Sequence, residues 1–444
     1  MAVYKDFNKY FKFENLESLY IEKISHKPSM GIDGINKKSF ESNLNTYISI
    51  VNRKVFNSSY NFTPYKEKLI SKGKNKHPRI ISVPTLRDKL TLATIHKILS
   101  NAYSLNIKQE LVQTTIAKIK KAIELDKYDY FIKLDIETFY DRIDHEILLK
   151  KLKRKVRKKE LLNLIMKALK TPTINVNTQK PYIDNEKGVP QGLSISNILA
   201  NVYMNDLDKE LNTNNKFAYF RYVDDILILC KEEDKAYIEK KIEKKIKQLG
   251  LDVHPDKNIS GCLLTEEFTF LGYKIQNQSL RVLERNVHKL EKSIAEVFTC
   301  YKYSDFKRTN EFVWSLNIKI TGGIIQQNKY GWLFFYSQIN NLKVLYKLDW
   351  YITQLWKKFG INKVERKYIK SFVKSFNEIS FNRSKTKYIP NFDKYTIQQK
   401  KILLTDIFEI KNVDHFSEER IDRYFKKYVF NTIKKLDKDI QHIS

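Results

Sequence analysis

Two short apolar runs, at residues 220–223 and 226–229, flank the adjacent acids Asp224 and Asp225. This pattern predicts a hairpin of two buried strands with both acids at its turn. Adjacent carboxylates repel each other, so a buried turn that holds two of them is costly unless a cation lies between them. Carboxylate oxygens favour Mg²⁺ in that place. An acidic pair alone is equally typical of a solvated turn, so other segments must decide.

A second strand-like run, at residues 131–136, holds the single acid Asp135. An unpaired acid within a buried strand is costly, and it is tolerable if it faces the same cation as the acidic pair. Carboxylates that clamp two divalent ions are the usual arrangement for in-line nucleotidyl transfer. The three acids together therefore favour a metal-dependent reaction on phosphates.

Glycines mark two further segments. Residues 188–192 form a loop with glycine and proline, and the apolar stretch that follows predicts a helix to about Leu211 with Ser194 as its cap. A glycine loop that enters a helix permits close approach to a substrate, although a plain turn has the same pattern. Gly272, between bulky residues, predicts a tight hairpin.

The remaining periodic segments predict mainly helices. Amphipathic or capped helices are expected from about Thr85, over 107–126, from the cap Asp144, over 232–249 with Gly250 as the stop, and from near Ser417. The densely aromatic residues 330–336 are expected to pack in a core, with stacking on bases as the alternative. Strands and helices mixed in this way predict an α+β fold.

In their order and spacing, these segments resemble the reverse transcriptase family. Asp135 resembles the acid of motif A, and residues 188–194, 222–225 and 251–257 resemble motifs B, C and D. The primer grip, motif E, is matched by Phe270, Leu271, Gly272 and Tyr273. Residues 79–88 resemble the fingers motif of group II intron and other bacterial enzymes, and 31–35 resemble their N-terminal extension. Leu92 departs from the pattern, since the bacterial fingers motif commonly has glutamine there.

The resemblance implies a right-hand polymerase fold. It has fingers, a palm made of an antiparallel sheet backed by helices, and an α-helical thumb and C-terminal domain. The expected division is an N-terminal extension at 1–65, a fingers and palm core at 66–280, a thumb-like region at 281–360 and a basic helical domain at 361–444.

The resemblance also assigns roles to single residues. Asp135, Ile136, Asp224 and Asp225 would hold two Mg²⁺ ions, with Mn²⁺ as an alternative. Lys257 would join the three acids in catalysis by protonating pyrophosphate, although a plain surface lysine has the same pattern. The nucleotide would be bound by Arg79, Tyr140, Gln191, Gly192 and Ile136.

Tyr140 carries a further implication about the sugar. In the family, this position holds the aromatic ring beneath the incoming sugar, and a bulky ring there excludes a ribose 2′-hydroxyl. Tyr140 thus predicts a preference for deoxynucleotides, with a buried core tyrosine as the alternative. Arg79 is expected to contact phosphates, with a solvated basic hairpin as its alternative.

Charge points to a polyanionic partner. The formal net charge is +30, and residues 281–444 contribute +15 of it. A strongly basic protein of this kind suits a nucleic-acid backbone, although a solvated lysine-rich surface has the same composition. Residues 150–159 hold eight basic side chains, which form either a phosphate-facing patch or a solvated helix end.

Other features bear on the compartment. The three cysteines form no C-x-x-C pair, which favours a reducing compartment and disfavours a zinc module. The sequence shows no apolar run of membrane-spanning length and no signal-peptide pattern at its start. A cytoplasmic protein without a membrane partner is expected.

The resemblance implies an RNA-directed DNA polymerase with an RNA template, deoxynucleotides (dNTPs) as substrates and a DNA product. The helical C-terminal third looks most like stand-alone bacterial enzymes of antiphage defence, which would imply a dedicated non-coding RNA and leaves open a second protein or a homo-oligomer. A retron or group II intron-type mobile-element enzyme is one alternative. A catalytically silent RNA-binding scaffold is an alternative of another class.

Overall fold

The chain forms two compact units in the computed structural model, which describes residues 2–25, 29–71, 73, 77–103, 110–177, 183–305, 308–361, 365–383 and 385–440. The first unit comprises Met1–Glu110 and Tyr130–Ser260, and the second comprises Leu111–Asp129 and Gly261–Ser444. The four-part division expected from the sequence stays a prediction.

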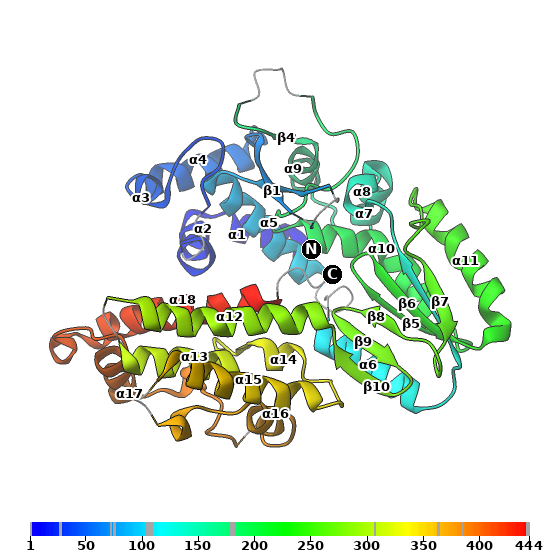
Figure 1. Cartoon of the computed structure of the whole chain (residues 1–444). Coiled ribbons are helices and arrows are strands. Elements are labelled where there is room, and N and C mark those ends of the chain that lie inside the picture. The colour runs from blue at the N-terminus through cyan, green and yellow to red at the C-terminus, as the bar shows by residue number, and fades with distance from the viewer. Residues whose placement is uncertain are drawn as a thin grey trace. The chain divides into compact units, whose positions relative to one another are not determined.

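The larger sheet of the first unit has four strands in the order β5-β6-β3-β7 (Figure 1). Its strands are β3 (Tyr130–Asp135), β5 (Ala218–Tyr222), β6 (Asp225–Cys230) and β7 (Ile259–Cys262), and β6 pairs antiparallel with both β5 and β3. Helix α10 (Ser196–Asn212) packs against β5 and α11 (Lys235–Gln248) packs against β3. Isoleucines at a spacing of four residues fix the buried face of α11, namely Ile238, Ile242 and Ile246. The expected α+β class, with an antiparallel sheet backed by helices, is confirmed.

A smaller sheet in the first unit has the order β2-β1-β4. Its strands are β1 (Tyr65–Ile70), β2 (Arg79–Val83) and β4 (Thr173–Ile174). The other helices of this unit are α1 (Ala2–Tyr10), α2 (Phe13–Leu19), α3 (Lys37–Glu41), α4 (Leu44–Phe56), α5 (Leu86–Tyr103), α7 (Phe139–Arg142), α8 (His145–Lys153) and α9 (Lys159–Lys170), with the short turns η1 (Tyr20–Ile24) and η2 (Glu232–Asp234).

Asp88 of the expected fingers motif is a structural residue. It is fully buried near the start of α5, where its carboxylate accepts hydrogen bonds from the Tyr60 hydroxyl at 2.7 Å and the Thr63 N–H at 3.0 Å. A buried carboxylate is tolerated only with such partners. Asp88 therefore ties the segment before β1 to the helix that follows β2.

Several predicted helix ends are confirmed. Asp144 caps α8 by accepting the N–H of Ile147 at 2.8 Å, and α11 is followed by Gly250 with a φ of 68°. The cap predicted at Ser194 is wrong, because α10 begins at Ser196 and its N-cap, Ile195, offers no side-chain acceptor. The Ser196 hydroxyl instead donates to the Pro190 carbonyl at 2.6 Å, so serine holds the glycine loop rather than the helix end.

The second unit is mostly helical. Its helices are α6 (Val112–Glu124), α12 (Glu284–Tyr303), α13 (Thr309–Thr321), α14 (Trp332–Phe335), α15 (Lys343–Phe359), α16 (Phe372–Phe381), α17 (Ile397–Ile402) and α18 (Glu418–Ile440), with η3 (Arg366–Tyr368), η4 (Phe392–Lys394), η5 (Leu403–Ile407) and η6 (Val413–His415). Two antiparallel sheets accompany them, made of β8 (Phe268–Phe270), β9 (Tyr273–Gln276) and β10 (Ser279–Val282), and of β11 (Gly323–Ile325) and β12 (Asn328–Tyr330).

Two sequence predictions concern this unit. The aromatic segment packs in a core as expected, since Trp332, Phe334 and Tyr336 are at most 4% exposed. The helix predicted over 107–126 is α6, and residues 107–109 lie outside the described part. Although α6 directly precedes β3 in the chain, it belongs to the second unit.

Candidate active site

The acidic pair lies at a tight turn between β5 and β6. Tyr222 pairs with Asp225, so the turn consists of Val223 and Asp224 alone. Val223 has a φ of 59°, a left-handed conformation that a β-branched side chain adopts at a cost. Its carbonyl accepts a hydrogen bond of 2.7 Å from Nη1 of Arg221. The turn is therefore strained and held by a neighbouring side chain.

The third acid is brought to the same end of the sheet by strand pairing. The β3–β6 register sets Asp135 opposite Asp225, and the N–H of Ile136 donates to the carbonyl of Asp224 at 3.3 Å. Residues far apart in the sequence thus gather here because β3 and β6 are neighbours.

Burial makes the two carboxylates of the acidic pair costly to ionise. It raises the pKa of Asp225 to about 6, with the charge of Asp224 as the next cause. Burial also raises the pKa of Asp224, and the charge of Asp135 adds to that effect. A divalent cation would reverse both shifts because it favours the ionised form.

A lysine ammonium already compensates part of this negative charge. Nζ of Lys257 lies 2.6 Å from Oδ2 of Asp135. As the side chains stand, no three His, Cys, Asp or Glu groups within the described part of the chain converge on one point. The carboxylate oxygens and the cation already drawn to them nevertheless fit a hard metal ion such as Mg²⁺.

The segment that carries Lys257 is tied to β3. The N–H of His254 donates to the Asp135 carbonyl at 2.7 Å, and the N–H of Glu137 donates to the Asp252 carbonyl at 2.9 Å. Arg142 adds ion pairs to the carboxylates of Glu137, at 2.6 Å, and of Asp252. Sequence reasoning missed this arginine because its two partners lie on separate loops.

The glycine loop lies between β2 and the segment that carries Tyr140. The carbonyl of Gln191 accepts the N–H of Ser82 at 2.7 Å, and the N–H of Val189 donates to the carbonyl of Tyr140 at 2.8 Å. Gly192 has a φ of 99°, and a Cβ there would lie 2.6 Å from Cγ2 of Ile81. Only glycine fits this close contact.

Gly192→Ala is therefore expected to lower the free energy of unfolding by about 2–3 kcal/mol, through backbone strain and overpacking together. Gly250→Ala is the matched control, since Gly250 has a φ of 68° and open space around it. The control should lose only about 1 kcal/mol. Thermal and denaturant melts of both variants measure the difference, and equal losses would contradict the close contact.

The other candidate nucleotide residues lie near the acids. Arg79 is the first residue of β2. Burial raises the pKa values of Asp224 and Tyr140, and the positive charge of Arg79 offsets part of this rise in both. The hydroxyl of Tyr140 donates to Oδ1 of Asn197 at 2.6 Å. Ile136 is 2% exposed and its side chain is apolar, so only its main chain could contact a bound ion or nucleotide.

A buried ion pair behind the acidic turn was also missed from the sequence. Nε and Nη2 of Arg221 donate to the two carboxylate oxygens of Asp208 at 2.7 and 2.6 Å, and Nη2 reaches Oδ1 of Asn201 at 3.3 Å. Asp208 also accepts the Tyr219 hydroxyl at 3.0 Å. An arginine within an otherwise apolar strand was the one signal that could have indicated it.

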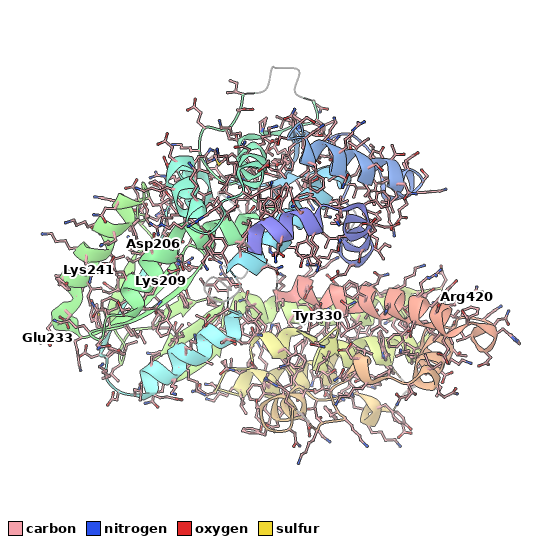
Figure 2. The ribbon with its side chains drawn as sticks, turned by 180° about the vertical axis from the view of Figure 1, so that it is seen from behind. Asp206, Lys209, Glu233, Lys241, Tyr330 and Arg420 are labelled. Atoms are coloured by element: carbon pink, nitrogen blue, oxygen red, sulfur yellow. The ribbon has the colours of Figure 1, made fainter. Side chains whose placement is uncertain are left out.

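Part of the basic run at 150–159 is engaged inside the protein. Asp206 of α10, labelled in Figure 2, pairs with Lys151 at 3.1 Å and with Arg154 at 2.8 Å. Lys158 pairs with Glu160 at 2.8 Å. These three cations therefore serve the fold, whichever role the rest of the run has.

The candidate primer grip belongs to the second unit. It forms the turn of the β8–β9 hairpin, where Phe270 pairs with Tyr273 and the turn residues Leu271 and Gly272 have φ values of 49° and 81°. The tight glycine hairpin predicted from the sequence is confirmed. The hydroxyl of Tyr273 donates to the Phe335 carbonyl at 2.6 Å, which anchors the hairpin to α14.

Comparison with known proteins identifies the class. Residues 70–275 match the family described as reverse transcriptase (RNA-dependent DNA polymerase). That region includes the glycine loop and all three acids, and it is the part of the chain that belongs to the reverse transcriptase family.

Curated relatives agree with this assignment at low identity. The chain is 23% identical to the putative COX1/OXI3 intron 1 protein of Saccharomyces cerevisiae, covering 60% of this chain and 39% of that protein. It is 24% identical to protein YkfC of Escherichia coli, covering 42% and 51%. It is 30% identical to the group II intron-encoded protein LtrA of Lactococcus lactis, covering 33% and 25%. The chain thus spans from a quarter to about half of the length of these relatives.

Similar solved structures include telomerase of Candida albicans with a TWJ fragment of telomeric RNA, at 13% identity, a TM-score of 0.49 and coverage of 86% of this chain and 68% of that chain. Apo telomerase of Candida tropicalis matches at 16% identity, a TM-score of 0.45 and coverage of 84% and 65%.

Among the described helices, none is both long and apolar enough to cross a membrane.

Proposed function

We propose that this chain is an RNA-directed DNA polymerase that adds deoxynucleotides to a 3′-hydroxyl with two divalent metal ions. The observation that carries the proposal is the gathering of Asp135, Asp224 and Asp225 at one end of the four-stranded sheet, with the pKa values of the acidic pair raised by burial. The match of residues 70–275 to the reverse transcriptase family supports the same reaction.

Each candidate residue has a role in this proposal. Asp135, Ile136, Asp224 and Asp225 would hold Mg²⁺ or Mn²⁺, which when bound favours ionisation of the 3′-hydroxyl and neutralises the triphosphate. Lys257, already beside Asp135, would donate a proton to the leaving pyrophosphate. Arg79 would contact the triphosphate, and Gln191 and Gly192 would line the nucleotide and template face. Tyr140 would exclude the ribose 2′-hydroxyl, and the 270–273 hairpin would position the primer.

The proposed biological role is antiphage defence in the bacterial cytoplasm, with a dedicated non-coding RNA as the template and a second protein or further copies of the chain as partners. The 30% identity to an intron-encoded protein favours a second candidate, a group II intron-type mobile-element enzyme, and a retron enzyme remains in the same class. A silent RNA-binding scaffold is disfavoured, because a protein without metal chemistry gains nothing from gathering three acids where burial raises the pKa values of two of them.

The test is to purify the chain without nuclease, sequence any bound nucleic acid, and then supply labelled dNTPs and Mg²⁺. One defined RNA copied into DNA would support the dedicated-template role. Random cellular RNA, with activity only on an added primer and template, would support the mobile-element role. A lack of incorporation under both conditions would contradict the polymerase proposal.

Metal binding has its own readout. Mg²⁺ at about 100 times its dissociation constant is expected to stabilise the wild-type chain by about 2.7 kcal/mol, because the folded site alone binds the ion. The double variant Asp224→Asn/Asp225→Asn should show almost no rise in Tm, whereas Asp184→Asn, at an exposed acid, should respond as the wild type does. Equal shifts in the wild type and the double variant would place the metal elsewhere.

A further inference from the structure

Helix α10 presents a line of polar side chains to the candidate active site. Asn197, Asn201 and Asp208 are spaced by four and seven residues, which places them on one face of the helix. Asn197 accepts from the Tyr140 hydroxyl, while Asn201 and Asp208 accept from Arg221. One rigid helix therefore holds both the tyrosine proposed to contact the sugar and the arginine that supports the acidic turn.

The ring of Tyr140 is fixed at both ends. Its main chain lies in the short helix α7, where its carbonyl accepts the N–H of Val189 at 2.8 Å. Its hydroxyl ends on Oδ1 of Asn197 at 2.6 Å. A tyrosine side chain has only two torsions, so an anchor at the hydroxyl leaves the ring one orientation.

We propose that Asn197 is a positioning residue that sets the choice between deoxyribonucleoside and ribonucleoside triphosphates, by holding the ring of Tyr140 where it excludes a 2′-hydroxyl. The proposal rests on the polymerase function above and adds a specificity determinant to it. Exclusion by a ring depends on its orientation, because a ring that can tilt makes room for one extra oxygen. The residue that fixes the orientation is then as important for selectivity as the ring itself.

Asn197→Ala keeps the ring and removes its anchor. The ratio of kcat/KM for dNTP to that for the matching ribonucleotide (rNTP) is expected to fall by about fivefold to tenfold, the effect of one hydrogen bond to a neutral partner. Tyr140→Phe removes the same hydrogen bond from its other end and should lower the ratio by a similar factor. The double variant should fall no further than either single variant, because both changes break one interaction.

Two variants separate positioning from general damage. Asn197→Asp keeps the acceptor oxygen and should restore the ratio, since its added charge acts equally on two substrates with the same triphosphate. Asn205→Ala, on the same helix two turns beyond Asn197, should leave the ratio unchanged. Steady-state incorporation of single nucleotides on a defined primer and template gives kcat and KM for each substrate.

The outcomes of this test are distinct from those of the polymerase test. If the wild type incorporates no dNTP, the proposed function fails. If the wild type is active, but Asn197→Ala and Tyr140→Phe keep the wild-type ratio, the function stands and the role of Asn197 is overturned. Equal losses for dNTP and rNTP in Asn197→Ala would also overturn it, since the ratio would not change.

Discussion

Asp225→Asn is expected to lower the rate of deoxynucleotide addition by about 10³-fold and, at neutral pH, to make the metal-free protein more stable. The rate falls because metal ions held by the carboxylates stabilise the transition state by several kcal/mol, and each 1.4 kcal/mol changes the rate about tenfold. The gain follows because burial and the charge of Asp224 raise the pKa of Asp225 to about 6 in the folded chain.

The sign of the stability effect follows from proton binding. The unfolded carboxyl has a pKa near 3.8, so between about pH 4 and 6 the folded state binds the proton and the unfolded state does not. The free energy of unfolding therefore falls as pH rises through this window. Above about pH 6, the full cost of holding the Asp225 carboxyl ionised in the folded chain is present. At about 1.4 kcal/mol per pKa unit, the cost at neutral pH is up to about 3 kcal/mol. Asparagine has no charge, so the Asp225→Asn variant does not carry this cost.

Thermal melts without metal at pH 4 and pH 7 measure the effect beside incorporation assays. Asp225→Asn should gain Tm over the wild type at pH 7 and lose most of that advantage at pH 4. Asp184→Asn, at an exposed acid, is the control for a simple change of net charge. A variant that is inactive but no more stable than the wild type at pH 7 would contradict the electrostatic account of this site.

Local patterns in the sequence were sufficient to predict the strands and the turn that carry Asp224 and Asp225. Apolar runs on both sides of Asp224 and Asp225 predicted the hairpin, and the stop at Gly250 and the cap at Asp144 were also found. Each of these features depends on residues within a few positions of one another. The family resemblance added the grouping of Asp135 with the pair.

Contacts between distant segments were not predictable in this way. The Ser194 cap was wrong because α10 begins at Ser196, which makes Ile195 the N-cap. The bond from Tyr140 to Asn197 joins residues 57 positions apart, and Arg221 pairs with Asp208 across two elements. No periodicity encodes such pairs, since they exist only after α10 packs against β5 and against the segment that carries Tyr140.

Arg221→Met is expected to destabilise the chain by about 3–5 kcal/mol and also to slow polymerisation. The side chain of Arg221 is 7% exposed and that of Asp208 is 24% exposed, so the variant leaves a largely buried carboxylate without its partner. The carbonyl of Val223 loses its hydrogen bond as well, so the strained turn that carries Asp224 is held less firmly.

A second substitution separates these two effects. Asp208→Asn in the Arg221→Met background removes the unpaired charge while keeping an oxygen for the Tyr219 hydroxyl. The double variant should therefore regain much of the lost stability, as replacement of both partners of a buried pair commonly does. Activity should stay low and need more Mg²⁺, because the support of the Val223 carbonyl is still absent. If activity recovered in step with stability, Arg221 would serve the fold alone, and the position of the acidic turn would not depend on it.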